Sequence, residues 1–397
     1  WRELPVPVWR ACLGEIERVM TALLADPARP VHLSLPSGAD ADALGIAAFT
    51  AGMGPLLGFW IEEGSVVCDA AAASLLRLHL THGRRRAERQ VTELRAALEV
   101  LRRADICATV IKGAHTGLAY FPEAGTRPAA DVDLVVDPTE RRRAYEALSA
   151  AGYEPTVQRP SKPYKCEWLP PGMTRELRSL ALAHGDGPFV IEMHDSLERV
   201  FNGVRTVSPG AVEKTTTQPF PALHPCVRVL TQPLLAAFLA LHASEELHQL
   251  QLVRLLELVL VLRADTASGA LRFDALANVL ARDDAFRFAY PAFELAERMA
   301  PGTLDPVFHA RLAASATPRI RRFVERLRPA DAQRFDRMSL EERFLFAHGA
   351  AETARRAAYV VWPRLADHSV EPLHAVYARR LYRIVRGRIS WRSRAGP

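Results

Sequence analysis

Lysine is scarce in this sequence of 397 residues, although the chain is basic. It occurs only at Lys112, Lys162, Lys165 and Lys214, so arginine supplies nearly all of the positive charge behind the net charge of +6 and the pI near 9.2. A bias toward arginine, together with abundant alanine, leucine and proline, is what a GC-rich genome produces without selection for function. The basic pI is therefore weak evidence for a nucleic-acid partner, which stays open but is not favoured.

Closely spaced cysteines and long apolar runs are also lacking. The five cysteines are scattered and never spaced as Cys-x-x-Cys, which indicates neither a disulfide framework nor a zinc site. No segment approaches the ~18 apolar residues that span a bilayer, and the start at Trp1 lacks the features of a signal peptide. We expect a soluble globular protein, with the cytoplasm as its default location. Because the first residue is not Met, the completeness of the N-terminus stays open.

Hydrophobic periodicity divides the chain into three predicted regions. Apolar residues recur every three to four positions in the first and last regions, whereas short strand-like runs lie between them. We predict an α+β fold with a helical N-terminal region (1–104), a small mixed α/β core (105–218) and a helical C-terminal domain (219–397). Three prolines between Pro219 and Pro225 favour a linker, with no strand after it and a first helix from Leu230 to Arg263.

Two aspartates stand two residues apart in the strand-like run DVDLVV, at Asp131 and Asp133. Because side chains alternate across a strand, both carboxylates project from one face. Two adjacent like charges make each other harder to ionise unless a cation lies between them. The pair therefore predicts a divalent metal site. The alternative is that both carboxylates line the solvated face of an edge strand, since such a pair is a weak motif alone.

Lys112 and Gly113 form a predicted turn between a short strand and a helix. A glycine at such a turn lets phosphate oxygens approach backbone N–H groups, and the positive end of the following helix favours an anion. This turn predicts a phosphate-binding site.

Glu192 lies within a later strand-like run, between Pro188 and Met193. A carboxylate in the middle of an apolar strand is costly to bury unless a cation or hydrogen bonds compensate it. We predict that this strand lies beside the strand of Asp131 and Asp133. The three carboxylates would then share one or two Mg²⁺ ions.

Three segments, taken together and in their order along the chain, resemble a known family. VIKGAHTGL, GTRPAADVDLVVDPTERRRAYEALSAAGYEP and VIEMHDSL are similar to the largely uncharacterised bacterial nucleotidyltransferases of the polymerase-beta-like superfamily. The resemblance implies a nucleotidyltransferase core that transfers a nucleoside monophosphate from an NTP such as ATP to an acceptor hydroxyl, with Mg²⁺. It implies catalysis and metal binding by Asp131, Asp133 and Glu192, and nucleotide binding by Lys112, Gly113 and Arg127.

The chain departs from this family pattern at two positions. Ala114 follows the turn glycine where Ser or Gly is usual, so the turn offers no hydroxyl to a phosphate, and Asp195 replaces the aromatic residue that commonly follows His194. Neither change removes a carboxylate. For Arg127, the alternative to phosphate binding is a structural ion pair with Asp131.

The resemblance extends weakly to the segment ASEELHQLQLVRLLELVLVLR. It implies accessory roles for His248 and Glu257 on a helix over the site, with Glu257 in place of the more usual Asp. The alternative is a surface ion pair between Arg254 and Glu257, which are three residues apart. His194 is a further accessory candidate, although a strand histidine is more often a packed, hydrogen-bonded residue.

The sequence does not encode the acceptor, which could be a small molecule, a peptide, a protein or an RNA. Family members found beside lasso-peptide biosynthesis genes add natural-product biosynthesis to these options. The competing hypothesis is a non-catalytic nucleotide-binding or interaction protein that retains the fold. The arginine-rich end between Arg379 and Arg394 could bind RNA, lipid or an acidic partner, but a solvated helix end is the simpler interpretation.

Overall fold

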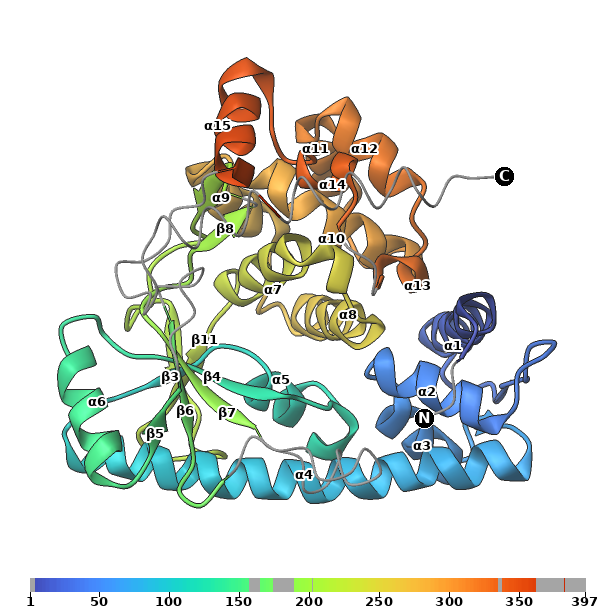
Figure 1. The fold of residues 1–397 in the computed structure, drawn as a ribbon, viewed down its shortest axis with the longest axis horizontal. Coiled ribbons are helices and arrows are strands. Elements are labelled where there is room, and N and C mark those ends of the chain that lie inside the picture. The colour runs from blue at the N-terminus through green and yellow to red at the C-terminus, as the bar shows by residue number, and fades with distance from the viewer. Residues whose placement is uncertain are drawn as a thin grey trace.

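A computed structural model describes residues 4–156, 165–173, 189–201, 203–334 and 338–361, together with Tyr382. Figure 1 shows helices at both ends of the chain around a mixed β-sheet, which confirms the predicted α+β class. Apart from Tyr382, the basic C-terminal segment lies outside the described residues.

The N-terminal region is mainly helical, with one short parallel strand pair that the sequence did not predict. Its elements are α1 (Val6–Ala25), β1 (Val31–His32), α2 (Ala41–Thr50), α3 (Gly54–Glu62), β2 (Val66–Val67) and α4 (Ala70–Arg103). The Asp69 side chain caps α4 by accepting hydrogen bonds from the backbone N–H groups of Ala71 and Ala72. At 1.5 Å per residue this helix is about 51 Å long, and it runs beneath both the N-terminal helices and the sheet (Figure 1).

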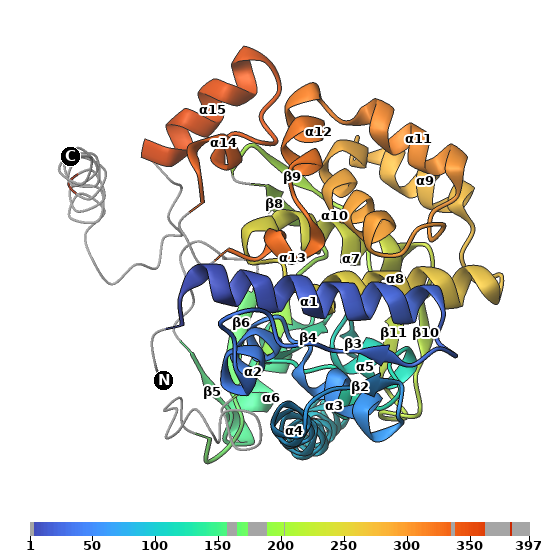
Figure 2. The same ribbon diagram turned by 90° about the vertical axis from the view of Figure 1, so that its right-hand side faces the viewer.

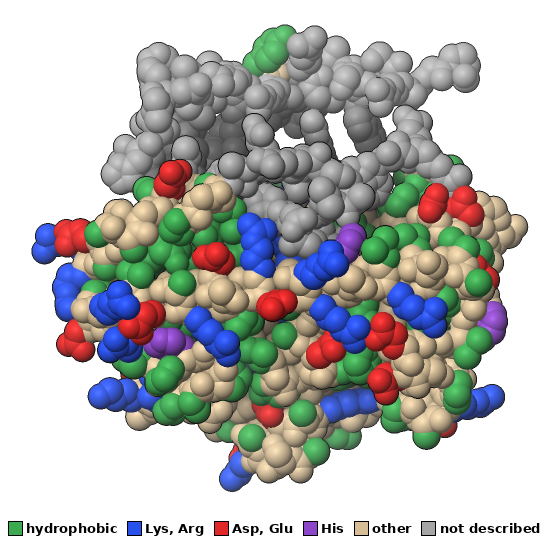
Figure 3. Space-filling model, turned by 90° about the horizontal axis from the view of Figure 1, so that it is seen from below, with side chains coloured by type: hydrophobic (Ala, Val, Ile, Leu, Met, Phe, Trp, Pro, Cys, Tyr) green, Lys and Arg blue, Asp and Glu red, His purple; other side chains and the backbone are tan. Residues whose placement is uncertain are grey.

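The outer surface of α4 carries both signs of charge. Figure 3 views the molecule from this side, and blue Lys and Arg side chains alternate there with red Asp and Glu side chains. Arg84, for example, pairs with both Glu62 and Glu123. Among the side chains described on this face, no extended patch of one charge is present.

The central sheet has the strand order β10-β11-β3-β4-β7-β6-β5. The elements of this part are β3 (Thr109–Val110), α5 (Ala114–Ala119), η1 (Ala124–Thr126), β4 (Asp131–Val135), α6 (Arg141–Ala150), β5 (Glu154–Pro155), β6 (Lys165–Leu169) and β7 (Val190–His194). The middle strand β4 runs antiparallel to β3 and parallel to β7. It is thus an interior strand, which excludes the alternative of a solvated edge strand for the two aspartates.

The sheet continues past residue 218, the end of the predicted core. Strands β10 (Thr217–Pro219) and β11 (Arg228–Leu230) pair antiparallel, and β11 pairs in parallel with β3. The expectation of a linker followed by no strand is therefore wrong, because the proline-rich segment connects two paired strands. A strand of three residues is too short to show an alternating apolar pattern in the sequence. Strand β11 is stabilised by β3, which lies more than a hundred residues earlier. A separate two-stranded sheet comprises β8 (Arg199–Phe201) and β9 (Arg205–Val207).

The two faces of the central sheet differ in composition. Val110, Val132, Leu134, Ile191 and Met193 point to one face and share a core with Leu94, Leu98 and Leu101 of α4 and with Ala144 and Leu148 of α6. The opposite face carries Asp131, Asp133, Glu192 and His194, and it looks toward the C-terminal helices (Figure 1). We call these the apolar face and the polar face.

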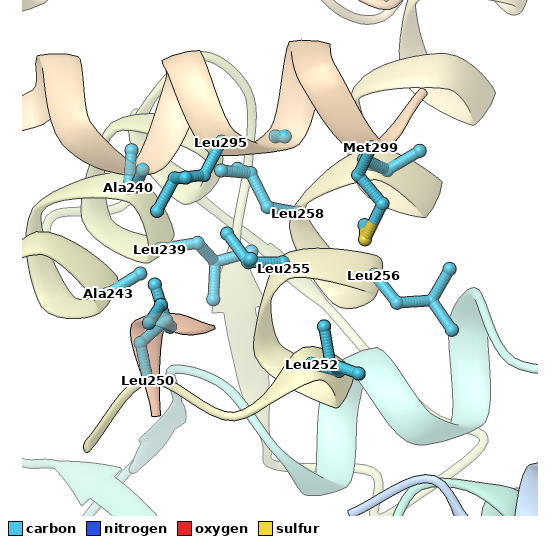
Figure 4. Packing of buried hydrophobic residues seen from close by; sticks show 14 of the residues in the cluster. Leu239, Ala240, Ala243, Leu250, Leu252, Leu255, Leu256, Leu258, Leu295 and Met299 are labelled. Atoms are coloured by element: carbon cyan, nitrogen blue, oxygen red, sulfur yellow. The ribbon is translucent and has the colours of Figure 1, made fainter. Parts of the chain in front are cut away.

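The C-terminal region is a layered set of helices. Its elements are α7 (Leu234–Glu245), η2 (Leu247–Gln249), α8 (Leu252–Ala267), α9 (Phe273–Arg282), α10 (Phe286–Met299), α11 (Pro306–Ser315), α12 (Pro318–Glu325), α13 (Pro329–Ala332), α14 (Leu340–Arg343) and α15 (Gly349–Val361). Figure 4 shows the leucine-rich packing of α7, α8 and α10, with Leu239, Leu255 and Leu295 near its centre. Figure 2 shows α1 crossing the molecule between these helices and α2.

The predicted helix from Leu230 to Arg263 is wrong in two respects, because Leu230 ends β11 and the chain breaks the helix at η2. The break seats the start of α8 against the corner between α2 and α3, where Val253 N–H donates to Ala51 O (3.1 Å) and Gln251 Nε2 donates to Thr50 O (2.9 Å). Tertiary hydrogen bonds of this kind compensate the bonds that a continuous helix would make.

Within the described ranges, no single helix has the length and apolarity needed to cross a membrane. Helices α2 and α3 meet that criterion only as a pair, bent by 118° at the break between them.

Candidate functional site

The pairing of β4 with β7 places Asp133 directly opposite Glu192. In the same register Asp131 lies opposite Val190, and Val135 lies opposite His194. Adjacent strands are about 4.8 Å apart, so side chains of opposed residues on one face lie close together. The strand of Glu192 therefore lies beside the strand of the two aspartates, as the sequence predicts.

Asp133, Glu192 and His194 form a buried group whose potential ligand atoms all lie within 4.8 Å of one another. His194 Nε2 is 2.9 Å from Asp133 Oδ1 and 3.5 Å from Glu192 Oε2. Asp131 is not part of this compact group. The predicted metal ligands were Asp131, Asp133 and Glu192, whereas the compact group contains His194 instead of Asp131. His194 is also the packed, hydrogen-bonded residue that its alternative interpretation describes.

Lys112 supplies the positive charge that two neighbouring aspartates need. Its ammonium nitrogen lies 3.0 Å from Asp133 Oδ2, and its side chain is almost fully buried. Burial raises the pKa of Asp133, but Lys112 and the hydrogen bond from His194 outweigh it and hold that pKa well below the ordinary range. Burial likewise opposes the charge of Lys112, yet the Asp131 and Asp133 carboxylates raise its pKa. The pair is therefore ionised.

Asp131 behaves differently from Asp133, although the two share a face. It is partly exposed, and its pKa is raised by burial and by the neighbouring carboxylates of Asp133 and Glu192, against the opposing effect of Lys112. A carboxylate whose pKa is raised favours the approach of a further cation, because that cation stabilises the charged form. Asp131 is thus the site carboxylate with the most to gain from a metal ion.

Lys165 is a site residue that the sequence analysis missed. It lies on β6, opposite His194, and its ammonium pairs with Glu192. Burial raises the pKa of Glu192, but hydrogen bonds from His194 and Lys165 lower it below its ordinary value. Two of the four lysines in the chain, Lys112 and Lys165, therefore neutralise site carboxylates. Because lysine is so rare in this sequence, its scarcity was the signal that could have identified Lys165.

Arg127 and Glu257 form a buried ion pair between the sheet region and α8. Arg127 Nε and Nη2 donate to the two Glu257 oxygens at 2.9 and 2.8 Å, and Thr116 of α5 donates to Glu257 Oε1. Both alternatives drawn from the sequence are wrong, since Arg127 does not pair with Asp131 and Glu257 is not on the surface. Glu257 therefore ties the chain before β4 to the helical layer.

The turn at Gly113 has a backbone conformation that favours glycine, with φ of +58°. A Cβ atom on Gly113 would lie 3.5 Å from Arg127 Nη1, the guanidinium nitrogen that the two bonds to Glu257 leave unused. The helix after the turn has only six residues, so its dipole is weak. Lys112 and Arg127 are thus the stronger sources of positive charge beside this turn.

His248 is not brought to the carboxylates. It lies in η2, where burial lowers its pKa and its charged neighbours are Glu342, Glu246 and Arg334 of the helical region. The accessory role implied for it by resemblance has no geometric support among the described residues.

The donor set fits a divalent cation. Asp133 Oδ2 is buried, and among the described residues the Lys112 ammonium is its close polar neighbour, at 3.0 Å. The metal-binding atoms nearby are carboxylate oxygens and one imidazole nitrogen. Oxygen-rich sets of this kind suit Mg²⁺ and Mn²⁺, and an added imidazole widens the range to other divalent metals.

Comparison with known proteins gives one match. The model of a family described as uncharacterised nucleotidyltransferase matches residues 37–301, which include the whole central sheet, α7 and α8. No curated protein and no solved structure matches the chain. The family match spans more than half of the sequence and contains every residue of the site described above. The chain belongs to this family of uncharacterised nucleotidyltransferases.

Proposed function

We propose that the protein is a Mg²⁺-dependent nucleotidyltransferase that moves a nucleoside monophosphate from an NTP to an acceptor hydroxyl. The observation that carries this proposal is the pairing of Asp133 with Glu192 across β4 and β7, buried beside Asp131 and His194, in a chain of this family. When bound, Mg²⁺ would neutralise phosphate charge and favour ionisation of the acceptor hydroxyl.

In this proposal Asp131, Asp133 and Glu192 hold the metal, and Lys112, Gly113 and Arg127 hold the nucleotide. The acceptor oxygen forms a bond to the α-phosphorus, and the bond from that phosphorus to the α–β bridging oxygen breaks. Pyrophosphate leaves with the electron pair, and the hydroxyl proton passes to a carboxylate, for which Glu192 is the candidate. Glu192 must first exchange its contact with Lys165, because that ammonium occupies one of its oxygens.

Glu257 acts in this scheme as a positioning residue. It holds Arg127 and Thr116 from α8, and so fixes the loop before β4 and the helix after the Gly113 turn. A catalytic site on rigid elements needs this kind of support, because a displacement of about 1 Å can cost ~10²-fold in rate.

Thermal unfolding with and without nucleotide tests the proposal. Wild-type protein should be stabilised by ATP or another NTP only when Mg²⁺ is present, and release of pyrophosphate should accompany transfer. Asp133→Asn should lose both effects. Asp137→Asn is a matched control, because Asp137 follows the same strand but is exposed, and its side chain accepts hydrogen bonds from the neighbouring Thr139.

The competing function is a non-catalytic protein that keeps the fold. It predicts that NTP stabilises the protein equally with and without Mg²⁺, or not at all, and that Asp133→Asn leaves the result unchanged. The acceptor is an open part of the proposal, and a small molecule, a peptide such as a lasso peptide, a protein or an RNA would each supply the required hydroxyl.

A further inference from the structure

Two arginines that the sequence analysis did not assign to the site contact α7 or the residue that follows it. Arg199 begins β8, its guanidinium stacks over the Phe238 ring at 4.7 Å, and its Nη1 is 3.9 Å from Glu245. Arg254 lies in the first turn of α8 and donates to Glu246 (3.0 Å) and His242 (3.1 Å). The two arginines thus lie beside α7, one from β8 and one from α8.

Arg199 is buried without enough partners. It is 4% exposed, and its Nε and Nη2 donate no hydrogen bond to any described residue. Its contact with Glu245 is too long for a hydrogen bond. A buried cation with unused donors is costly, and such donors are retained where an anion will meet them.

Arg254 is paired with Glu246, but the dipole of its own helix opposes its charge. A helix carries partial positive charge at its N-terminus, so an arginine in the first turn of α8 is electrostatically unfavourable there. Its side chain is 21% exposed, which leaves it accessible to a ligand while Glu246 and His242 hold it in place. Its position suits a group that has to present positive charge to a bound anion.

Both arginines act on the site electrostatically. Arg254 lies near enough to Lys112 and Asp131 for their charges to interact, and Arg199 lies near enough to Lys112. Lys112, Arg199 and Arg254 therefore share one electrostatic environment, contributed by the sheet, β8 and α8.

We propose that Arg254 and Arg199 bind the β- and γ-phosphates of the nucleotide, facing Lys112 across the polar face of the sheet. This inference rests on the proposed function and deepens it. The turn at Gly113 carries Ala114 and no hydroxyl, its helix is short, and Arg127 has two of its three nitrogens engaged with Glu257, so a triphosphate needs donors in addition to Lys112 and Arg127. Arg254 meets the phosphates first because it is accessible, and Arg199 lies deeper.

Titration calorimetry with Mg²⁺-pyrophosphate tests the role of Arg254 and Arg199. Each charge-assisted hydrogen bond to phosphate that is lost should weaken binding by about tenfold or more, in Arg254→Gln and in Arg199→Gln. Binding of Mg²⁺ with adenosine monophosphate, which has no β- or γ-phosphate, should change by less than about twofold by the same reasoning.

Two other arginines serve as matched controls. Arg263 lies on the same helix as Arg254 but donates to Thr303 and to Leu24 O, and Arg287 is buried over the Phe288 ring, as Arg199 is over Phe238. Arg263→Gln and Arg287→Gln should leave pyrophosphate affinity unchanged. If Arg199→Gln does not fold, Arg254→Gln decides alone, because its side chain is not fully buried.

The outcomes separate the two proposals. If the wild type binds Mg²⁺-NTP and Arg254→Gln binds pyrophosphate as tightly as the wild type, the arginine inference is overturned and the proposed function stands. An equal loss of affinity for adenosine monophosphate also overturns it, because Arg254 would then only support the site. If the wild type binds neither NTP nor pyrophosphate with Mg²⁺, both proposals fail.

Discussion

The two faces of the central sheet are built from the same strands but serve different purposes. On β4 and β7, the side chains of one face are apolar and pack on α4 and α6, and the other face carries Asp131, Asp133, Glu192 and His194 together with Val135 and Val190. The apolar face gains free energy from burial, at ~25 cal/mol per Å² of apolar surface. The polar face must compensate buried charge with Lys112 and Lys165.

This difference teaches that one face stabilises the fold while the other carries the candidate chemistry. A strand alternates with period two, so a residue can be changed on one face without touching the other. Substitutions on each face should therefore separate stability from activity.

The largest effect is expected from the two aspartates of the polar face. Asp131→Asn and Asp133→Asn should both reduce nucleotide transfer to background, while the fold remains intact by circular dichroism. Their stabilities should differ, because the pKa of Asp133 is lowered in the folded protein and that of Asp131 is raised. At neutral pH, Asp133→Asn should destabilise the protein and Asp131→Asn should be neutral or stabilising. Full transfer activity in both variants would rule out the metal site.

A smaller but still large effect is expected from the apolar face. Trp168 on β6 is buried and packs edge-on against Tyr145 at 5.1 Å. Trp168→Ala should lower the free energy of unfolding by ~3–5 kcal/mol, because it removes a large ring and leaves a cavity. Urea unfolding of Trp168→Ala and of Asp131→Asn under the same conditions compares the stability effects of the two faces directly. Equal stability of the two variants would contradict the assignment of the faces.

Acid should act on α4 through His79, a buried residue next to Gly54 of α3. Burial lowers its pKa from 6.5 to about 4, so the unfolded state binds more protons between these two values. Stability should be complete above pH 6.5 and should fall by up to ~3 kcal/mol as the pH decreases toward 4. Urea titrations of wild type and His79→Gln at pH 7 and pH 4.5 measure this. A drop of the same size in both proteins would exclude His79 as its source.

The smallest effect is expected from Lys112→Arg. Charge is retained, but a guanidinium is wider than an ammonium and would crowd both Asp133 and an incoming phosphate. The Michaelis constant for NTP should rise by about tenfold, the equivalent of ~1.4 kcal/mol. An unchanged Michaelis constant would show that Lys112 is not a phosphate ligand.

Local patterns predicted those parts of the molecule that local interactions determine. The strand of Asp131 and Asp133, the helix that follows it and the later strand of Glu192 all form, and Gly152 ends that helix with φ of +85°. The place of Glu192 beside Asp133 was predictable because an isolated buried carboxylate needs a partner.

Features that depend on distant partners were not predictable. Strand β11 forms because it pairs with β3, and the break at η2 forms because α8 bonds to the α2–α3 corner. Lys165 reaches Glu192 only through the pairing of β6 with β7, and Arg127 finds Glu257 130 residues later. The rarity of lysine singles out Lys165, but no residue near the other three features carries a signal for its partner.

Helix α4 affects both the folding of the chain during synthesis and the positions at which the chain can be truncated. It is one uninterrupted helix that packs on α2 and α3 through its first half and under the sheet through its second half. Because it is synthesised before any strand of the central sheet, the cover for the apolar face leaves the ribosome first. A fragment starting at residue 105 would lack this cover and expose Val132, Leu134 and Ile191 to water, so a stable fragment that contains the sheet has to include the second half of α4.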